Sequence, residues 1–572
     1  MNTLFSIRRF SSILLTAAFA LLLFTACDSI GDFGDMNRNP TEASSINPGL
    51  EFSTVQLGTA GSRWETWRTN LIYKELIVQH LGTNLGYWFG DDYGLSSGYA
   101  SSFFRAAYNG GVNGSAWLAA VKNVENLISR LRGDDGQVAS EDVNRVAAAR
   151  VWRVLIYQRL TDTFGDIPYQ EAGQGYLEGE FTPRYTPQDS IYFNMHTELQ
   201  AALDQFDASQ PTYGNADLVY GGDVDQWKRF ANSLQLRLAM RIVKVAPSRA
   251  EQWAVEAINS DAGVMQSNDD IAYMSHQEGP SGGAAGFNTN ANSEVYAFGV
   301  PRLSQRMVDF MKGNDDPRLL TYGAREVDGQ VISDPDTVKG WPNGYTATTI
   351  DEHPSWTGDY NDYLALNPTF RDLSDPIFFQ TYAEVEFMRA EAAARGWTSE
   401  SAADHYEAGV RAAMNYLSMY GSDASISSSE IDDYLAQNPY QSSAPLSDRL
   451  DQINTQYWAA TLLNGFEAWA NWRRSGYPEL DPAPVDDPEQ GAGSFTEGVI
   501  MRRLIYPGSE ESLNNENYTE ARNRQNITDQ NQLTAPVWWD CGALADQCNV
   551  TGLGPQADPE HPSNGPGDAP AD

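Results

Sequence analysis

The hydrophobic residues of this chain recur mainly at the spacing of helices. Segment 141–160 (EDVNRVAAARVWRVLIYQRL) carries apolar side chains three or four positions apart, on one helical face: Val143, Ala147, Val151, Val154, Tyr157 and Leu160. Segment 227–247 has the same spacing and stops at Pro247, because proline cannot continue a helix. Both segments therefore predict long amphipathic helices.

Two more helical segments follow one another at 376–397 and 401–421. The apolar stripe of the first is Phe378, Tyr382, Val385, Met388 and Ala392, and that of the second is Ala402, Tyr406, Val410, Ala413 and Leu417. Gly396 lies between them, where the end of a helix favours a residue that tolerates a positive φ. Such helical hairpins are typical of TPR-like repeats, although no regular 34-residue period is present.

Long segments without periodicity separate these helices. They cover 82–116, 276–300 and 321–376, and the predicted strands are few and short, for example Gln330–Ser333. Loops of this length inside a compact domain are usually functional or disordered. The pattern predicts a mainly α fold, in which a TPR-like helical-hairpin scaffold carries a long-loop, ligand-binding remainder.

The N-terminus has the layout of a secretory signal. Two arginines at 8 and 9 precede an apolar run from Ile13 to Phe24, and Phe-Thr-Ala-Cys ends at Cys27. These four residues resemble the bacterial lipobox, in which the cysteine becomes the lipidated first residue of the mature protein. Several acyl chains on one cysteine give stable membrane anchoring. An ordinary signal peptide with an incidental Cys27 is the alternative.

The charge of the chain excludes one class of partner. Removal of residues 1–26 takes away two arginines and no acid, so 76 acidic residues face 36 basic ones, a net charge of −40. Such a surface repels the phosphates of nucleic acids. No segment after the signal has the roughly 18 consecutive apolar residues of a membrane-spanning helix.

Two other cysteines lie near the C-terminus. Cys541 and Cys548 are seven positions apart, a spacing that a flexible loop can close with a disulfide. A zinc site is the alternative, but no further Cys or His lies close to them in the tail. We expect residues 536–572 to form a partly disordered tail with this local disulfide.

Catalytic motifs are scarce. G-x-S-x-G occurs at 94–98 and 279–283, in both cases without the strand and helix that a nucleophile elbow requires. Zinc-protease, P-loop, dinucleotide and calcium-loop patterns are absent, and the six histidines are scattered. Paired carboxylates such as Asp91 and Asp92 could serve a glycosidase, but pairs are common in so acidic a chain. We expect no catalytic residue, metal or cofactor, although acidic loops could hold a structural calcium ion.

Aromatic residues are abundant in the predicted loops. A phenol or indole face offers a flat apolar platform to a sugar ring, while neighbouring polar groups bind its hydroxyls. The alternative is that each ring packs its loop onto the body. The candidate ligand-binding residues are Trp64, Trp67, Tyr87, Trp88, Tyr93, Trp341, Tyr345 and Trp356.

Seven stretches, in order along the chain, resemble the SusD/RagB family of surface lipoproteins. They begin at Asp35 and end near residue 521: DMNRNP, TDTFGDIPYQEA, WKRFANSLQLRLAMRI, GNDDPRL, AEVEFMRAEAAARGW, GFEAWANWRRSGYPEL and RRLIYPGSEESLNNENYTEA. We expect these stretches to build the scaffold, because ligand residues vary within the family.

This resemblance implies a non-enzymatic protein that binds nutrient oligosaccharides or peptides. It further implies a lipid anchor in the outer membrane, facing the exterior, and delivery to a SusC-like TonB-dependent barrel. The expected organisation is a signal peptide (1–26), a lipidated tether (27–50), a SusD-like domain (51–535) and the tail (536–572). A secreted glycoside hydrolase and a TPR-like protein-binding scaffold are the alternatives.

Overall fold

The computed structural model describes most of the chain after residue 46. The described residues are 47–61, 67–86, 88–110, 119–133, 136–175, 179–277, 290, 292, 301–327, 330–332, 337–484 and 495–541. The chain separates into two units, Met1–Asn47 and Pro48–Asp572, and every helix and strand described below belongs to the second unit. Cys27, Trp64, Tyr87 and Cys548 lie outside the described residues.

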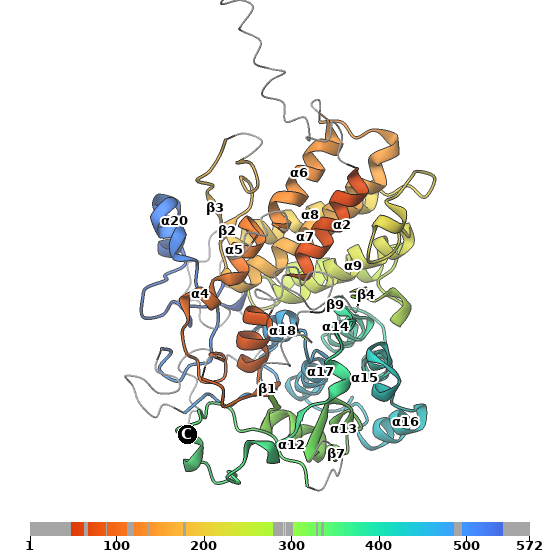
Figure 1. Ribbon diagram of the computed structural model, residues 1–572. Coiled ribbons are helices and arrows are strands. Elements are labelled where there is room, and N and C mark those ends of the chain that lie inside the picture. Colours follow the sequence, from red (N-terminus) through yellow and green to blue (C-terminus); the bar gives the residue numbers. More distant parts are fainter. Residues whose placement is uncertain are drawn as a thin grey trace, which may run out of the picture. The chain divides into compact units, whose positions relative to one another are not determined.

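The second unit is built mainly from helices, which confirms the predicted fold class (Figure 1). The helices of its first half are α2 (Pro48–Ala60), a π-helix η1 (Trp67–Glu75), α4 (Ser97–Ala100), α5 (Ser102–Asn109), α6 (Ala120–Arg132), α7 (Val143–Phe164), α8 (Gln188–Gln205), α9 (Val224–Arg241) and α10 (Pro247–Ile258). Those of its second half are α12 (Gln305–Gly313), α13 (Arg318–Tyr322), α14 (Tyr382–Ala394), α15 (Ala402–Asn415), α16 (Ser428–Gln437), α17 (Leu446–Ala460), α18 (Gly465–Ser475), α19 (Gly508–Leu513) and α20 (Asn515–Arg524).

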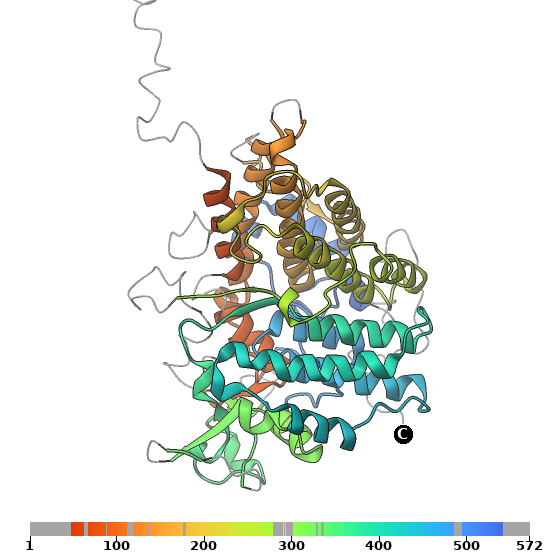
Figure 2. The same cartoon turned by 90° about the vertical axis from the view of Figure 1, so that its right-hand side faces the viewer.

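Consecutive helices pack as hairpins, as the TPR-like prediction requires. α7 packs against α8, α9 against α10 and α14 against α15, and the last pair lies side by side in Figure 2. α14 also contacts α17, which contacts α18. α18 in turn reaches α7 and α9, so it joins the two groups of hairpins.

Two details of the helix boundaries differ from the sequence pattern. α9 ends at Arg241, and Pro247 is the first residue of α10, a position where proline's missing N–H costs nothing. Phe378 belongs to a strand, because Thr381 and Glu384 form a capping box that starts α14 at Tyr382. Gly396 has a φ of +78°, which confirms the predicted helix end.

The strands are short and form three small antiparallel sheets. The largest has the order β1-β5-β8-β6-β7, while β2 pairs with β3 and β4 with β9. Their bounds are β1 Leu81–Gly82, β2 Ile167–Pro168, β3 Tyr185–Thr186, β4 Ala272–Met274, β5 Arg302–Leu303, β6 Gly323–Val327, β7 Gln330–Ile332, β8 Ala365–Leu366 and β9 Ile377–Gln380. β7 confirms the strand predicted near Gln330.

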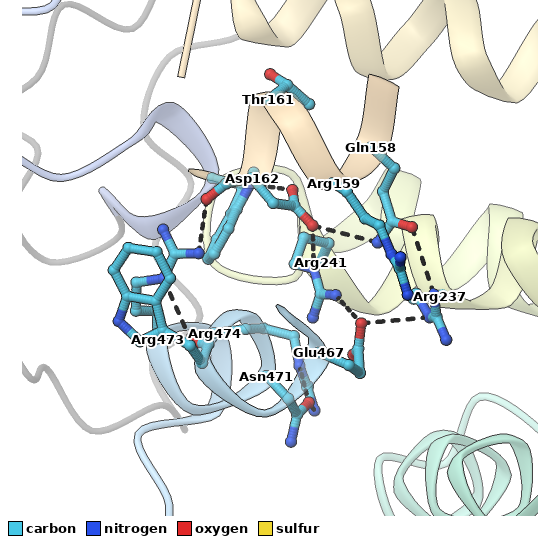
Figure 3. Close-up of polar contacts among 12 residues, drawn as sticks. Gln158, Arg159, Thr161, Asp162, Arg237, Arg241, Glu467, Asn471, Arg473 and Arg474 are labelled. Atoms are coloured by element: carbon cyan, nitrogen blue, oxygen red, sulfur yellow. Dashed lines mark hydrogen bonds and ion pairs between the residues drawn. The ribbon is translucent and has the colours of Figure 1, made fainter. Parts of the chain in front are cut away.

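A buried ionic network joins the helices at the centre of the scaffold (Figure 3). Arg241 of α9 lies 2.7 Å from Glu467 of α18 and 3.3 Å from Asp162 of α7. Arg237, one turn earlier, lies 2.6 Å from Glu384 of α14 and 3.4 Å from Glu467. All five side chains are buried, so each charge depends on its partners.

Four of the seven stretches that resemble the SusD/RagB family contribute to this network, with Glu384 coming from AEVEFMRAEAAARGW. Asp162 comes from TDTFGDIPYQEA, Arg237 and Arg241 from WKRFANSLQLRLAMRI, and Glu467 from GFEAWANWRRSGYPEL. Burial opposes ionisation of Glu467, but Arg241 and Arg237 outweigh that effect and hold its pKa below the usual value. These four stretches therefore contribute buried charges to the scaffold.

Most of the apolar core is one continuous cluster of helix-facing side chains. A second, smaller cluster lies in the long segment before β8 and consists of Trp341, Ile350 and Tyr363, with Tyr345, Trp356 and Tyr360 packed against it. None of the helices in the described part of the chain is long and apolar enough to cross a membrane.

Candidate ligand-binding site

A pocket of about 660 Å³ opens beside α12, the helix that follows β5. Its size is that of a small-molecule site. Four separate parts of the chain line it: Gln79; Gln305, Arg306, Asp309 and Phe310; Pro342, Asn343, Tyr345 and His353; and Asp481, Pro482 and Pro484. Aromatic, amide and charged side chains are thus brought together from positions about 400 residues apart.

The first wall is one face of α12. Ser304 caps the helix by accepting a hydrogen bond from the backbone N–H of Met307, 2.9 Å away. The side chains at 307, 308 and 311 are buried in the core, so those at 305, 306, 309 and 310 lie toward the pocket. Helical periodicity alone therefore explains why this wall carries Gln, Arg, Asp and Phe.

The second wall is aromatic. Tyr345 is half-buried and contacts His353 edge-to-face, with ring centroids 4.7 Å apart. His353 Nδ1 accepts a hydrogen bond from the backbone N–H of Ser355 at 3.1 Å, which leaves the proton of the neutral ring on Nε2. Partial burial lowers the pKa of His353, so the ring is neutral at neutral pH. This wall combines a phenol face with a neutral N–H donor.

The small aromatic cluster supports this second wall from behind. Trp341 is fully buried, with ring centroids 4.9 Å from Tyr360 and 5.1 Å from Tyr363. Trp356 is half-buried and stacks on Tyr363 at 6.0 Å. The long segment is therefore held in shape by its own core.

The third wall is the segment 481–484. The side chain of Gln79 donates a hydrogen bond to the backbone oxygen of Asp481, and the backbone N–H of Ala483 donates to the hydroxyl of Tyr93 at 3.2 Å. Two prolines at 482 and 484 further restrict this segment. The wall is consequently tied to the loop that follows η1.

Three charged side chains lie at the exposed edge of the pocket. Arg306, Asp309 and Asp481 are all solvent-exposed, and none of them forms a salt bridge within the described ranges. They remain available to the hydroxyl or amide groups of a ligand. Together with the amides of Gln79, Gln305 and Asn343, they provide many hydrogen-bonding groups around one aromatic face.

The predicted aromatic residues have different locations in the structure. Tyr345 alone among the six that are described lines the pocket, and Trp356 packs behind it. Four are buried in the core, where they expose no face to a ligand: Trp67 (6% exposed), Trp88 (2%), Tyr93 (2%) and Trp341 (0%). For these four, the structure supports the packing alternative, because neighbouring segments cover their rings.

Sequence patterns missed most of the residues that line the pocket. Phe310 lies outside the aromatic-rich loops, His353 is not a Trp, Tyr or Phe, and the amides of Gln79, Gln305 and Asn343 have no distinctive spacing. The one sequence signal for a pocket wall is the stripe at 305, 306, 309 and 310. It lies on the side of α12 opposite to the apolar residues 307, 308 and 311.

The other predicted sites give a mixed picture. Cys541 is buried and disulfide-bonded, and its expected partner Cys548 lies outside the described residues. Asp91 and Asp92, the example of paired carboxylates that was not predicted as a site, do not line the pocket. Within the described ranges no group of three or more His, Cys, Asp or Glu side chains is arranged to hold a metal ion.

Comparisons with known proteins identify the family. The sequence matches, over residues 40–507, the SusD-like family described as starch-binding and associating with the outer membrane. A solved structure described as a chitin-binding protein is 32% identical, covers 86% of this chain and 100% of its own, and superimposes with a TM-score of 0.72. No curated protein matches this chain.

Two further solved structures are similar over the same part of the chain. A SusD-like protein described as Bacteroidetes AC2a is 28% identical, with 86% and 100% of the two chains covered and a TM-score of 0.73. A chitin-binding SusD homologue from Flavobacterium johnsoniae is 25% identical, with 86% and 98% covered and a TM-score of 0.65. Fold, buried motif network and sequence agree, and the chain belongs to the SusD-like family.

Proposed function

We propose that this protein binds oligosaccharides at the pocket beside α12 and passes them to an outer-membrane transporter. The observation that carries this proposal is the pocket itself, where Tyr345, Phe310 and His353 surround a space lined with amides. Sugar rings present apolar C–H faces and hydroxyl groups, and this combination of side chains complements both.

Oligosaccharides of N-acetylglucosamine are the first ligands to test. Two of the similar structures are described as chitin-binding, and one of them is 32% identical to this chain. An N-acetyl group adds an amide to the sugar, and Gln79, Gln305 and Asn343 can exchange hydrogen bonds with it. The negative charge of the chain disfavours polyuronates.

The delivery part of the proposal follows the family. Lipidation at Cys27 would tether the body to the outer membrane, and a SusC-like TonB-dependent barrel would receive the ligand. The lipobox-like Phe-Thr-Ala-Cys and the membership in the SusD-like family support this part. We propose that the protein faces the cell exterior, where the polymers occur.

Two other functions make different predictions. A glycoside hydrolase needs two carboxylates across a sugar-binding cleft, and the sugar would be cleaved. A scaffold that binds only proteins would leave the pocket without a small ligand, and the burial of Trp88 and Trp341 is compatible with it. The half-exposed face of Tyr345 in a pocket favours sugar binding.

The test is binding of the mature chain, without its lipid, to neutral polysaccharides, acidic polysaccharides and peptides. We expect the unaltered protein to bind neutral oligosaccharides. In the Tyr345→Ala variant the binding free energy should weaken by about 1–3 kcal/mol, the usual contribution of a stacked ring. Tyr382→Ala is the matched control, because Tyr382 is a half-buried tyrosine of α14 outside the pocket.

The recovered ligand distinguishes the alternatives. Intact sugar, weakened in binding only by the Tyr345 substitution, supports the proposed function. Cleaved sugar would assign the protein to the hydrolases instead. Binding to peptides alone, unaffected by Tyr345→Ala, would favour the protein-binding scaffold.

A further inference from the structure

We propose that Asp91 is a positioning residue of the pocket, whose carboxylate holds the segment 343–345 where it lines the site. This inference rests on the proposed function of the pocket and explains a residue that does not itself line it. Asp91 is only 3% exposed, so its role cannot be direct contact with a ligand.

The carboxylate of Asp91 connects two loops through three hydrogen bonds. Its Oδ1 accepts from the side-chain amide of Asn343 at 2.5 Å and from the backbone N–H of Gly344 at 3.3 Å. Its Oδ2 accepts from the backbone N–H of Thr83 at 2.9 Å. Asn343 completes the connection by donating to the backbone oxygen of Leu81 at 2.9 Å.

The same contacts leave the segment little freedom. A Cβ on Gly82 would lie 2.7 Å from the ring of Trp341, and one on Gly344 would lie 2.6 Å from Pro484. The segment 341–345 is therefore clamped between the loop that holds Asp91 and the third wall of the pocket. Tyr93, two residues after Asp91, bonds the third wall through Ala483.

Removal of the Asp91 charge would weaken this connection. An ionised carboxylate can accept hydrogen bonds from all three N–H groups. A protonated carboxyl group has an O–H that donates a hydrogen bond and therefore accepts fewer. Burial raises the pKa of Asp91 to about 7. The hydrogen bonds from Asn343 and Gly344 oppose this rise, so the pKa of Asp91 is higher still in a loosened segment where the carboxyl stays buried without them. Lowering the pH through about 7 should therefore favour the loosened segment and reduce ligand affinity.

Several other ionisable groups of the described residues lie around the site. Asp92 and Tyr93 lie in the same loop as Asp91. Tyr345 and His353 lie on the second wall and Asp481 on the third. Arg306 and Asp309 lie on α12. Burial raises the pKa of Asp92 to about 6, and its carboxylate accepts a hydrogen bond from the backbone N–H of Gly94 at 3.1 Å, within its own loop. Asp92→Asn is therefore a matched control.

The experiment compares Asp91→Asn with Asp92→Asn and the unaltered protein, using the hexasaccharide of N-acetylglucosamine as probe. Asparagine has the shape of aspartate, but its amide nitrogen cannot accept a hydrogen bond. We expect calorimetry to show about tenfold weaker binding by Asp91→Asn at about pH 8, and little change for Asp92→Asn. On lowering the pH to about 6, affinity should fall in the unaltered protein and in Asp92→Asn but not in Asp91→Asn.

A second measurement needs no ligand. Hydrogen exchange at the backbone amides of 343–345 should be faster in Asp91→Asn than in Asp92→Asn, and it should accelerate in the unaltered protein below about pH 7, after correction for intrinsic exchange rates. If the probe does not bind but exchange responds in this way, the proposed ligand is wrong and the positioning role stands. Equal exchange in the two variants, or an affinity that changes with pH equally in both, would overturn the role of Asp91.

Discussion

At the scale of single residues, burial decides what a side chain does in this protein. Trp341 and Tyr345 are four positions apart in one aromatic segment, yet the first is fully buried and the second is half-buried and lines the pocket. Their chemistry is similar, so the difference comes from which segments cover each ring. Sequence patterns detect the aromatic segment but not its exposed member.

The charges of the scaffold can be tested at this scale. Glu467→Gln removes the anion that Arg237 and Arg241 share and leaves only Glu384 and Asp162 to balance these two charges, and removing one partner of a buried ion pair is strongly destabilising. We expect the free energy of unfolding, measured with urea, to fall by about 3 kcal/mol or more.

An exposed ion pair provides the control for this substitution. Arg411 and Asp432 lie 2.7 Å apart with much of each side chain in solvent. Asp432→Asn should cost less than about 1 kcal/mol. Similar costs for the two substitutions would show that the buried network contributes no more than a surface pair.

At the scale of elements, helices follow the local sequence and the pocket loops do not. α7 and α15 begin at or within a residue of their apolar stripes, and Gly396 ends α14 as its position indicated. The segment 341–363 instead folds on its own aromatic cluster and is held from outside by Asp91. Its shape depends on contacts distant in sequence, which no periodicity encodes.

The clamp on this segment can be tested with two glycines. Gly344 (φ +83°) and Gly358 (φ +91°) both have backbones that L side chains rarely adopt, but only Gly344 has close neighbours. Alanine at either position carries a backbone cost of about 1 kcal/mol. The added Cβ of Gly344→Ala must also displace Pro484 in the third wall. We therefore expect Gly344→Ala to weaken oligosaccharide binding and Gly358→Ala to leave it unchanged.

Calorimetric titration of the two variants with the N-acetylglucosamine hexasaccharide checks this expectation. Thermal unfolding run in parallel separates a loss of affinity from a loss of stability. If the two variants bind equally well, contact between Gly344 and Pro484 does not shape the pocket.

At the scale of the whole molecule, charge governs the response to pH. Burial raises the pKa of Asp91 to about 7 and those of Asp92 and Asp166 to about 6. A raised pKa means that the folded state binds the proton more tightly than the unfolded chain does, so stability increases as the pH falls through these values. The net charge of −38 acts in the same direction, because acid reduces self-repulsion.

The opposite effect begins at lower pH. Burial opposes ionisation of Glu391, but Arg474 and Arg395 outweigh that effect and hold its pKa far below the usual value. Arg241 and Arg237 likewise lower the pKa of Glu467. Their contribution is lost as the pH falls below the pKa of the unfolded chain. We therefore expect the melting temperature of the ligand-free protein to rise from about pH 8 to about pH 5 and then to decline.

Scanning calorimetry across this pH range, at low and high salt, measures the effect. Salt should reduce the part due to self-repulsion and leave the part due to buried carboxyls. A melting temperature that falls steadily from pH 8 downward would contradict the assigned pKa shifts. Ligand affinity should instead fall as the pH is lowered through about 7. Affinity and melting temperature should therefore change in opposite directions there, which distinguishes an effect on the pocket from an effect on global stability.

The sequence by itself determined the mainly helical fold, the hairpin of α14 and α15, and the family. The helices depend on local hydrophobic periodicity. The family is indicated by motifs that contain charged residues which pair when buried, such as Arg241 and Glu467. Only the tertiary structure decided which residues form the pocket. Gln79, α12, the 342–353 segment and the 481–484 segment meet there through folding, and the exposure of a ring such as Tyr345 depends on which distant segments cover it.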